Sequence, residues 1–392
     1  MPDDLALAPA APARAAHPGT DRAFASLPDP ATILAQVDTI SARDLVPLVR
    51  AIDAEGLYPE DVMRAYGAAG AYIRHLPAPG GVMDLDTTIA AMTRAGRECL
   101  STAFCMWCQS ALGWYIYNSD NAGLHETLGP QVASGAVLGG TGLSNPMKTL
   151  FGIETMKLKA TPVDGGYTLR GSLPWVSNIG PDAWFAVIAE IPEGERAGQR
   201  VMMLLHGSGA GVKLAANDHF VALEGTRTFS VQCRDAFVPS AQVLADPINA
   251  YVPKIRAGFI LLQSGMAFGM IEGCIALMEQ VRGPLGHVNQ HLPDQPEHFA
   301  EKLDALKAEV AELTKTPYDL SDGYFARVIR ARLAAGDLAV NAAHNAMLHC
   351  GARGYVTHGA AQRRLRESYF CAIVTPATKQ LRKMLADMGE TA

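Results

Sequence analysis

The sequence predicts an α+β fold made of an N-terminal helical domain, a central small β-barrel or sandwich, and a C-terminal four-helix bundle. Up to residue 134 and again from residue 249, apolar residues recur every three or four positions, as on one face of a helix. Between these segments the spacing falls to two, which is typical of strands. Because helices and strands do not alternate, the order argues against a doubly wound or TIM-barrel fold.

The domain boundaries follow from these changes of spacing. Residues 1–29 are rich in alanine and proline and lack the segments of a secretory signal, so we expect a disordered tail there. The remaining chain divides into the N-terminal helical domain (30–134), the central β domain (135–248) and the C-terminal four-helix bundle (249–392).

The elements expected within these domains are read from the same spacing. In the first domain the apolar stretch Leu85–Leu112 predicts one long buried helix. In the second, Asp164, Gly165 and Gly166 form a tight-turn signal between two strands, because glycine tolerates a positive φ. In the third, four long amphipathic stretches predict an antiparallel bundle: Ile255–Arg282, Pro296–Thr314, Asp322–Gly351 and Ala360–Leu385.

Composition and charge narrow the classes of function. The 392-residue chain is 49% hydrophobic with a net charge of −6, so it carries no basic footprint for nucleic acid. Its longest apolar run, Ala257–Met270, is shorter than the roughly 20 residues that span a bilayer, so no membrane segment is expected. Seven scattered cysteines without a secretory signal predict reduced thiols in the cytoplasm. Cys105 and Cys108 lie inside a helical pattern, which favours core residues, and no His, Asp or Glu cluster has metal-ligand spacing.

Several motifs are spaced in a recognisable way. The most specific is the run Gly166–Asn178, which ends in Trp-Val-Ser-Asn. The other segments are Ser144-Asn145-Pro146, Gly225–Pro239, Arg282–Gln295, Gly351–Tyr355 and Arg364–Glu367. Together with the order of helical, β and helical domains, these motifs resemble the acyl-CoA dehydrogenase superfamily of flavoproteins.

The resemblance implies a bound flavin, FAD or alternatively FMN, in a homotetramer. Alternation of side chains along a strand places Trp175 and Ser177 on one face. The family likeness implies that Trp175 packs against the isoalloxazine ring, that the Ser177 hydroxyl reaches N5, and that Ser144 bonds the carbonyl edge of the ring. The alternative interpretation of Trp175 and Ser177 is a core tryptophan beside a solvated serine.

Three further residues match the family at the phosphate side of the cofactor. Arg282 is a candidate partner of the pyrophosphate and would come from a neighbouring subunit, although an arginine at a helix end also suits a plain surface charge. Gln295 and Gly351 match the same part of the family's site.

The catalytic base of the family has no evident counterpart. Desaturation of an acyl thioester needs a group that removes the α proton while hydride passes to flavin N5, and a buried carboxylate suits this task. Aligning Arg366 and Glu367 with the family's Arg-Asp pair puts Thr375 at the position of the usual glutamate. The second family position, on the first bundle helix, falls in the apolar stretch Gly258–Leu262. The relocated candidates are Glu272 and Glu367, the latter also suited to a salt bridge with Arg366.

Three functions stay open. The resemblance favours an acyl-CoA dehydrogenase-like desaturase that passes electrons to an electron-transfer flavoprotein. However, Met147–Phe151 replaces the loop that holds the flavin phosphates and the CoA end of the substrate in the family, which puts CoA thioesters in doubt. A flavin-dependent monooxygenase, using reduced flavin from a reductase, O2 and a small apolar substrate, needs no carboxylate; its candidate polar groups are His344, His349 and His358. The third is a catalytically degenerate structural member.

Overall fold

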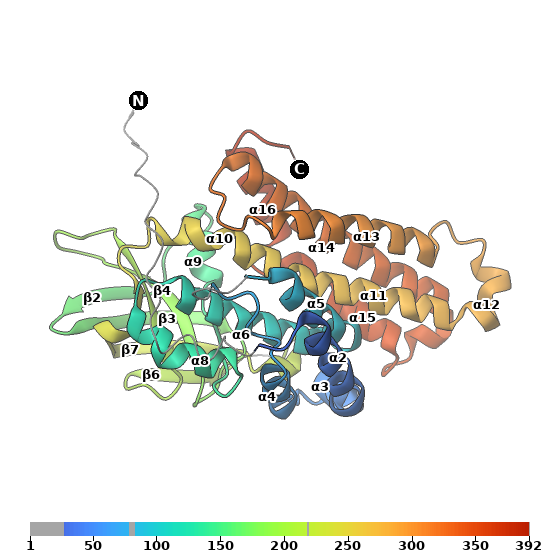
Figure 1. Ribbon diagram of the computed structural model, residues 1–392, viewed down its shortest axis with the longest axis horizontal. Coiled ribbons are helices and arrows are strands. Elements are labelled where there is room, and N and C mark those ends of the chain that lie inside the picture. Colours follow the sequence, from blue (N-terminus) through green and yellow to red (C-terminus); the bar gives the residue numbers. More distant parts are fainter. Residues whose placement is uncertain (1–26, 78–82, 218, 392) are drawn as a thin grey trace.

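The computed structural model describes residues 27–77, 83–217 and 219–391 (Figure 1). Helices come first, strands follow, and the chain ends in long helices packed side by side. This order confirms the predicted α+β fold class. Most of the expected tail, residues 1–26, lies outside the described part of the chain.

The N-terminal helices are built around α6 (Leu100–Asn118), which is buried along its whole length. The prediction of a single helix over Leu85–Leu112 is wrong at one point. Cys99 has an extended backbone (φ −149°, ψ 115°), so α5 (Leu85–Glu98) ends there and α6 begins separately. The other α-helices of this part are α2 (Pro30–Ile40), α3 (Val49–Ala54), α4 (Glu60–Ala68), α7 (Ala122–Glu126) and α8 (Leu128–Ala133).

Both cysteines of the helical pair are core residues of α6. Cys105 and Cys108 are fully buried, and burial raises the pKa of their thiols. A raised pKa keeps a thiol protonated and unreactive. Within the described ranges all seven cysteines are free and buried, and no group of three His, Cys, Asp or Glu side chains could hold a metal ion.

Helix α6 packs closely against α10 (Tyr251–Leu262). Trp114 Nε1 donates to the Ile255 carbonyl at 3.0 Å. The two helices approach so closely at Gly258 that a Cβ there would lie 2.4 Å from the Trp114 ring. Two turns earlier in α6, Trp107 Nε1 donates to the carbonyl of Phe259 at 3.3 Å. This contact fixes two aromatic side chains, Trp107 and Phe259, in the wall of the cavity described below.

The strands form one hydrogen-bonded path in the order β6-β7-β3-β2-β4-β5-β8, with β1 beside β4. The predicted hairpin is confirmed, because β2 pairs with β3 and Gly165 takes a positive φ of 74° in the turn. β3 and β7 pair antiparallel over most of their length. The strands are β1 (Gly139–Thr141), β2 (Lys159–Val163), β3 (Gly166–Val176), β4 (Trp184–Glu190), β5 (Arg200–His206), β6 (Val212–Ala216), β7 (Phe229–Pro239) and β8 (Val243–Ala245).

β4 and β5 are almost uninterruptedly apolar because both of their faces are buried. Phe185 and Val187 enter an apolar core that lies between the strands, whereas Ala186 and Ile188 belong to the helical core. Met203 and Met202 of β5 divide between the same two cores. The central strands therefore enclose a core of their own and share a second one with the helices.

The C-terminal helices α11, α13, α14 and α15 pack against one another (Figure 1). The apolar pattern continues from α10 into α11, so Tyr251–Gln280 is long and apolar enough to cross a membrane, which corrects the length estimated from the sequence. It is the one such stretch among the described residues, and 78% of its most apolar window is buried inside the protein. The remaining bounds are α11 (Ser264–Gln280), α12 (Arg282–Asn289), α13 (Pro296–Leu313), α14 (Asp322–Cys350), α15 (Ala360–Ile373) and α16 (Thr378–Asp387).

The last predicted helix, Ala360–Leu385, is two helices, α15 and α16. The reason is Pro376, which has no backbone N–H and whose ring disfavours helical backbone at the preceding residue, Thr375. The link between the helices carries Thr375 into contact with Ser144 of α9 (Ser144–Leu150).

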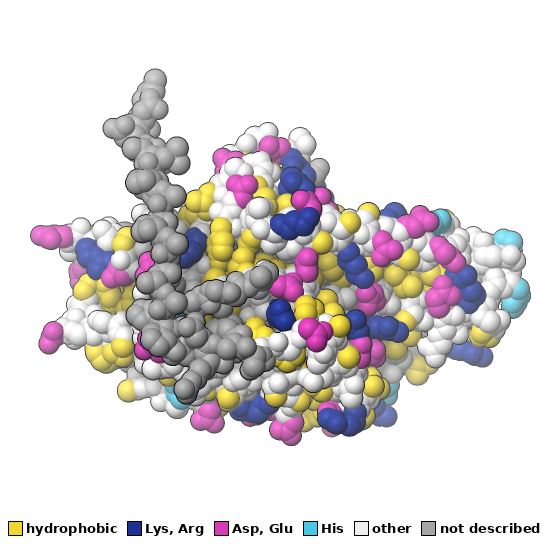
Figure 2. All heavy atoms as spheres, viewed as in Figure 1, with side chains coloured by type: hydrophobic (Ala, Val, Ile, Leu, Met, Phe, Trp, Pro, Cys, Tyr) yellow, Lys and Arg dark blue, Asp and Glu magenta, His cyan; other side chains and the backbone are white. Residues whose placement is uncertain are grey.

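The face drawn in Figure 2 carries charges of both signs. Among the described residues, Lys and Arg side chains are interspersed there with Asp and Glu. The mixture agrees with the net charge of −6. A phosphate backbone is bound by a field of one sign, which this face does not present.

A buried histidine beside α6 makes stability depend on pH. His75 Nε2 donates to the Ser110 carbonyl at 2.8 Å, and burial lowers the pKa of His75 to about 4. In the unfolded chain the His75 side chain has the ordinary histidine pKa of about 6.5 and binds a proton as the pH falls below that value. In the folded chain it binds a proton only at a lower pH, so acid favours the unfolded state. We therefore expect the free energy of unfolding to drop by about 2 kcal/mol from this residue between pH 7 and pH 5.

Urea unfolding at both pH values measures this effect. The variant His75→Gln keeps an amide donor and does not titrate, so its stability should fall less over the same interval. Equal losses in the two proteins would contradict the prediction.

Candidate functional site

A cavity of about 380 Å³ lies where α6, the sheet, α9, α10 and the end of α15 meet. Its wall is mostly apolar and aromatic, with Phe104 and Trp107 from α6, Phe259 from α10 and Phe370 from α15. The rings of Phe104 and Phe370 meet edge to face with centroids 4.5 Å apart. Volume and lining are typical of a site for a small organic ligand.

Four residues expected at the site line this cavity: Ser144, Trp175, Ser177 and Thr375. Trp175 lies near the end of β3 and is 53% exposed, so a face of its ring is free to meet a ligand. Ser177 follows two positions later, and the alternation of side chains directs it to the same side. The fold brings Ser144 and Thr375 together across 231 positions of sequence.

Thr375 has a fixed place in the wall. Its Oγ1 shares a hydrogen bond of 3.0 Å with Ser144 Oγ. Behind it, Gln263 Nε2 donates to the Thr375 carbonyl at 2.9 Å, and the buried Arg332 donates to Gln263 Oε1 at 2.8 Å. Arg332 also donates to the Cys371 carbonyl at 2.6 Å. Position 375 is thus held rigidly, but a hydroxyl there does not act as a base near neutral pH.

Two hydroxyls that sequence reasoning missed lie beside Ser177. Thr228 Oγ1 is 2.7 Å from Ser177 Oγ, and Thr226 Oγ1 is 2.8 Å from Thr228 Oγ1. Both threonines line the cavity just before β7. Their spacing, Thr226-x-Thr228, is the available signal. It gains meaning only once β7 is known to pair with the strand that carries Trp175.

The charged side chains of the lining are two cations whose acidic partners lie outside the cavity. Lys148 Nζ pairs with Glu154 Oε1 at 3.0 Å. The guanidinium of Arg366 pairs with Asp53 at 3.0 and 2.5 Å and donates to the Val221 carbonyl at 2.8 Å. Among the residues that the structure describes, no carboxylate lines the cavity.

The cavity includes both positions at which the resemblance implies a base. One is Thr375. The other lies in the apolar stretch Gly258–Leu262 of α10, from which Phe259 lines the cavity, and neither position is acidic. Glu272 of α11 pairs with Lys307 at 2.7 Å and lines a separate groove beside α5 and α13. The prediction of Glu272 as a candidate base is therefore wrong for this cavity, because the packing of α11 turns Glu272 away from it.

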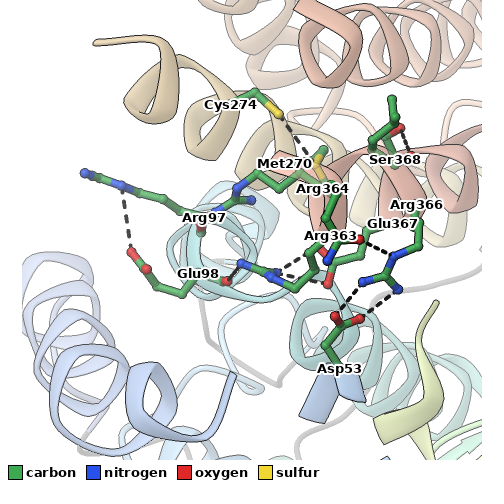
Figure 3. A network of polar contacts seen from close by, with 12 residues as sticks. Asp53, Arg97, Glu98, Met270, Cys274, Arg363, Arg364, Arg366, Glu367 and Ser368 are labelled. Atoms are coloured by element: carbon green, nitrogen blue, oxygen red, sulfur yellow. Dashed lines mark hydrogen bonds and ion pairs between the residues drawn. The ribbon is translucent and has the colours of Figure 1, made fainter. Parts of the chain in front are cut away.

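Glu367 is corrected for a similar reason. It is 1% exposed and pairs with Arg363 at 2.9 Å, within the polar network of Figure 3. Its partner is Arg363 rather than the expected Arg366, which turns instead to Asp53. Glu367 thus faces the interior beside α5 and does not line the cavity.

The three residues expected at the phosphate side lie elsewhere. Arg282 begins α12, which projects at the end of the molecule opposite to β3 and α9 (Figure 1). Asn289 of α12 donates to the His349 carbonyl at 3.0 Å, which ties α12 to the end of α14, just before Gly351. Gln295 follows in the turn before α13. Within one chain these residues do not reach the cavity.

Their present partners are local. Arg282 is half exposed and pairs with Glu279 at 2.8 Å and with Glu297 at 2.5 Å. Gln295 Nε2 donates to the Asn289 and Leu292 carbonyls at 2.9 and 2.8 Å.

The candidate histidines do not line the cavity. His349 is buried at the α12 end of the bundle, where its Nε2 donates to the Asp294 carbonyl at 3.0 Å. His344 and His358 are likewise absent from the described lining, whose polar side chains are hydroxyls and the cations Lys148 and Arg366.

Comparison with known proteins finds relatives that share this fold. A family model of the acyl-CoA dehydrogenase N-terminal domain matches residues 28–136. A probable acyl-CoA dehydrogenase of Bacillus subtilis (strain 168) is 21% identical over 358 residues, covering 85% of this chain and 90% of that protein. Among solved structures, butyryl-CoA dehydrogenase from Megasphaera elsdenii has a TM-score of 0.79 at 16% identity, covering 93% of this chain and 99% of its own. The FAD complex of PigA has a TM-score of 0.76 at 13% identity, covering 92% and 97%. The chain therefore matches the acyl-CoA dehydrogenase N-terminal domain over residues 28–136 and has the acyl-CoA dehydrogenase-like fold over most of its length.

Proposed function

We propose that the protein is an FAD-dependent oxidoreductase whose isoalloxazine ring occupies the cavity beside Trp175. The observation that carries the proposal is the meeting of Ser144, Trp175, Ser177 and Thr375 in one mostly apolar cavity. A flavin ring needs an apolar slot and a few hydrogen-bond partners at one edge. The aromatic face, the hydroxyl groups and the apolar lining of this cavity meet both needs. The solved FAD complex of PigA, which shares the fold, supports FAD over FMN.

The residues of the cavity have separate tasks in this proposal. Bound FAD would supply the two-electron oxidation and reduction. Trp175 packs against the ring, while Ser144 and Ser177 orient its polar edge. The aromatic side chains of Phe104 and Trp107, which close the opposite wall, exclude water and favour an apolar substrate.

We further propose oxygenation of a small apolar substrate as the reaction. Bound FAD in its reduced form would supply the two electrons with which one atom of O2 enters the substrate and the other leaves as water. The absence of a carboxylate from the described lining supports this choice, because oxygenation needs no side-chain base and desaturation does. Met147, which is buried in α9, and Lys148 stand where small residues hold the CoA end of the substrate in the family.

Desaturation of an acyl thioester is the second candidate. It is favoured by the curated relative and by butyryl-CoA dehydrogenase, both named for that activity. In this chain it would require a base that comes neither from Thr375 nor from the stretch Gly258–Leu262.

The partners differ between the two reactions. A flavin reductase would deliver electrons for oxygenation, and an electron-transfer flavoprotein would accept them after desaturation. We also propose a homotetramer, supported by the position of Arg282, Gln295 and Gly351 far from the cavity of their own chain, where a second copy could use them. The free, buried cysteines of the described chain support the proposal of a cytoplasmic location.

FAD uptake tests the cofactor part of the proposal. The purified protein should bind FAD with a yellow absorbance band, and Trp175→Ala should weaken the affinity for FAD by at least about tenfold, because an aromatic contact of this size is lost. Phe237→Ala, which removes an exposed aromatic side chain of β7 outside the cavity, is the matched control and should leave the affinity unchanged. A colourless protein that takes up no FAD, or equal affinities of wild type and Trp175→Ala, would contradict the proposal.

A further inference from the structure

Three hydroxyl groups and a carbonyl form a continuous chain at the floor of the cavity. Ser177 Oγ lies 2.7 Å from Thr228 Oγ1, which lies 2.8 Å from Thr226 Oγ1. Thr226 Oγ1 donates to the Leu223 carbonyl at 2.7 Å. Ser177, Thr226 and Leu223 are buried, and Thr226 is only 1% exposed.

The direction of this chain follows from counting protons. A hydroxyl has one proton to donate, whereas a carbonyl only accepts. Thr226 gives its proton to Leu223, so it must accept from Thr228; Thr228 has then spent its own proton and must accept from Ser177. The reverse direction would leave the buried Leu223 carbonyl without this partner, which is costly. Ser177 therefore donates to Thr228, and its proton is not available to a ligand.

The backbone holds the chain in register. The amide N–H of Asn178, the residue after Ser177, donates to the Thr226 carbonyl at 2.9 Å. Asn217 Nδ2 donates to the Thr228 carbonyl at 3.1 Å. Because both ends are anchored, the hydroxyls keep their spacing without help from a ligand.

We infer that Thr226 and Thr228 are positioning residues that turn Ser177 into a hydrogen-bond acceptor, so that the site binds reduced flavin more tightly than oxidised flavin. This inference rests on the proposed FAD site, in which Ser177 faces N5 of the ring. Oxidised flavin offers only a lone pair at N5 and needs a donor there, whereas reduced flavin offers an N–H and needs an acceptor. A Ser177 hydroxyl whose proton is committed to Thr228 suits the reduced form. A preference of this kind belongs to an enzyme that receives its flavin already reduced, which is the order that oxygenation requires.

The ratio of two dissociation constants tests the inference. The dissociation constants of oxidised FAD in air and of reduced FAD under anaerobic conditions are measured for the wild type and for Thr228→Val, which keeps the shape and removes the link. In Thr228→Val the Ser177 proton is free to turn to the cavity. The preference for reduced FAD should then fall about tenfold, which lowers the midpoint potential of the bound flavin by about 30 mV for a two-electron couple.

Two further variants separate the loss of the directed hydrogen bonds from a change in packing. Thr226→Val should produce a shift of the same sign, since Thr228 can then donate to Ser177 and release its proton. Thr228→Ser keeps the hydroxyl and should retain the wild-type ratio. Thermal unfolding checks that each variant is folded.

The possible outcomes distinguish a failure of this inference from a failure of the proposed FAD site. A wild type that binds neither form of FAD overturns the proposed function and the inference together. FAD binding with an unchanged ratio in Thr228→Val, or a wild type that prefers oxidised FAD, overturns the inference alone. A lower ratio in both valine variants with a retained ratio in Thr228→Ser supports it.

Discussion

Replacing Thr375 with glutamate is expected to create acyl-thioester desaturation in a protein that lacks it, with a gain of at least about 100-fold in the rate of flavin bleaching. Position 375 is fixed by Gln263 and Arg332 and lies in the cavity wall 3.0 Å from Ser144. A carboxylate there would be partly desolvated, which raises its pKa and makes it a better base. General-base catalysis contributes about 10²–10⁴-fold, and this sets the size of the expected gain.

The measurement is anaerobic bleaching of the FAD-loaded protein by two thioesters, butyryl-CoA and the smaller butyryl-N-acetylcysteamine. The wild type should bleach with neither, yet after chemical reduction it should consume O2 with a small apolar substrate. Thr375→Glu should bleach with the small thioester, and Thr375→Gln, of equal size but without a base, should not. Bleaching of the wild type would refute oxygenation as the first choice, and an inert Thr375→Glu would show that the cavity does not present a thioester to this position.

Neutralising Glu367 is expected to lower the free energy of unfolding by about 3–5 kcal/mol, because it leaves buried cations without their anion. Figure 3 shows Glu367 among Arg363, Arg364 and Arg366. Arg363 pairs with it at 2.9 and 3.1 Å. Burial lowers the pKa of Arg364. In Arg363 burial also acts to lower the pKa, but Glu367 and the other negative groups nearby together raise it.

Arg364 makes this network sensitive to the loss of a charge. Its Nε and Nη1 have no hydrogen-bond partner in the described structure, and its guanidinium presses on Gly273, where a Cβ would lie 2.2 Å from Cζ. Urea unfolding of Glu367→Gln measures the loss. Asp387→Asn breaks the exposed pair between Lys383 and Asp387 and serves as the control, with an expected cost below about 1 kcal/mol. A comparable small cost in Glu367→Gln would contradict the role assigned to the buried pair.

Local patterns predicted the parts of the fold that depend on neighbouring residues. The turn at Gly165 and the alternation that turns Trp175 and Ser177 to one side are both properties of a few adjacent positions. Pro376 indicates that a helix ends near Thr375, but the apolar spacing on both sides of that residue predicted one continuous helix. The break at Cys99 has no such marker in the sequence, because its extended backbone is imposed by the packing around it.

The parts of the site that depend on distant contacts were not predictable in this way. Glu272 has the right charge, but the direction of a side chain around its helix is decided by which face packs, and that face turns to Lys307. Thr226 and Thr228 acquire their importance from the pairing of β7 with β3. Their hydroxyls form a directed chain with Ser177 only after two strands far apart in sequence have met.

The two-sided burial of β4 and β5 bears on how the molecule can be divided. Ala186 and Ile188 are fully buried in the core shared with the helices, and Phe185 and Val187 are fully buried in the core between the strands. A fragment cut at the boundaries of the strand region would expose a continuous apolar row along both strands. The middle of this chain is therefore not a detachable module.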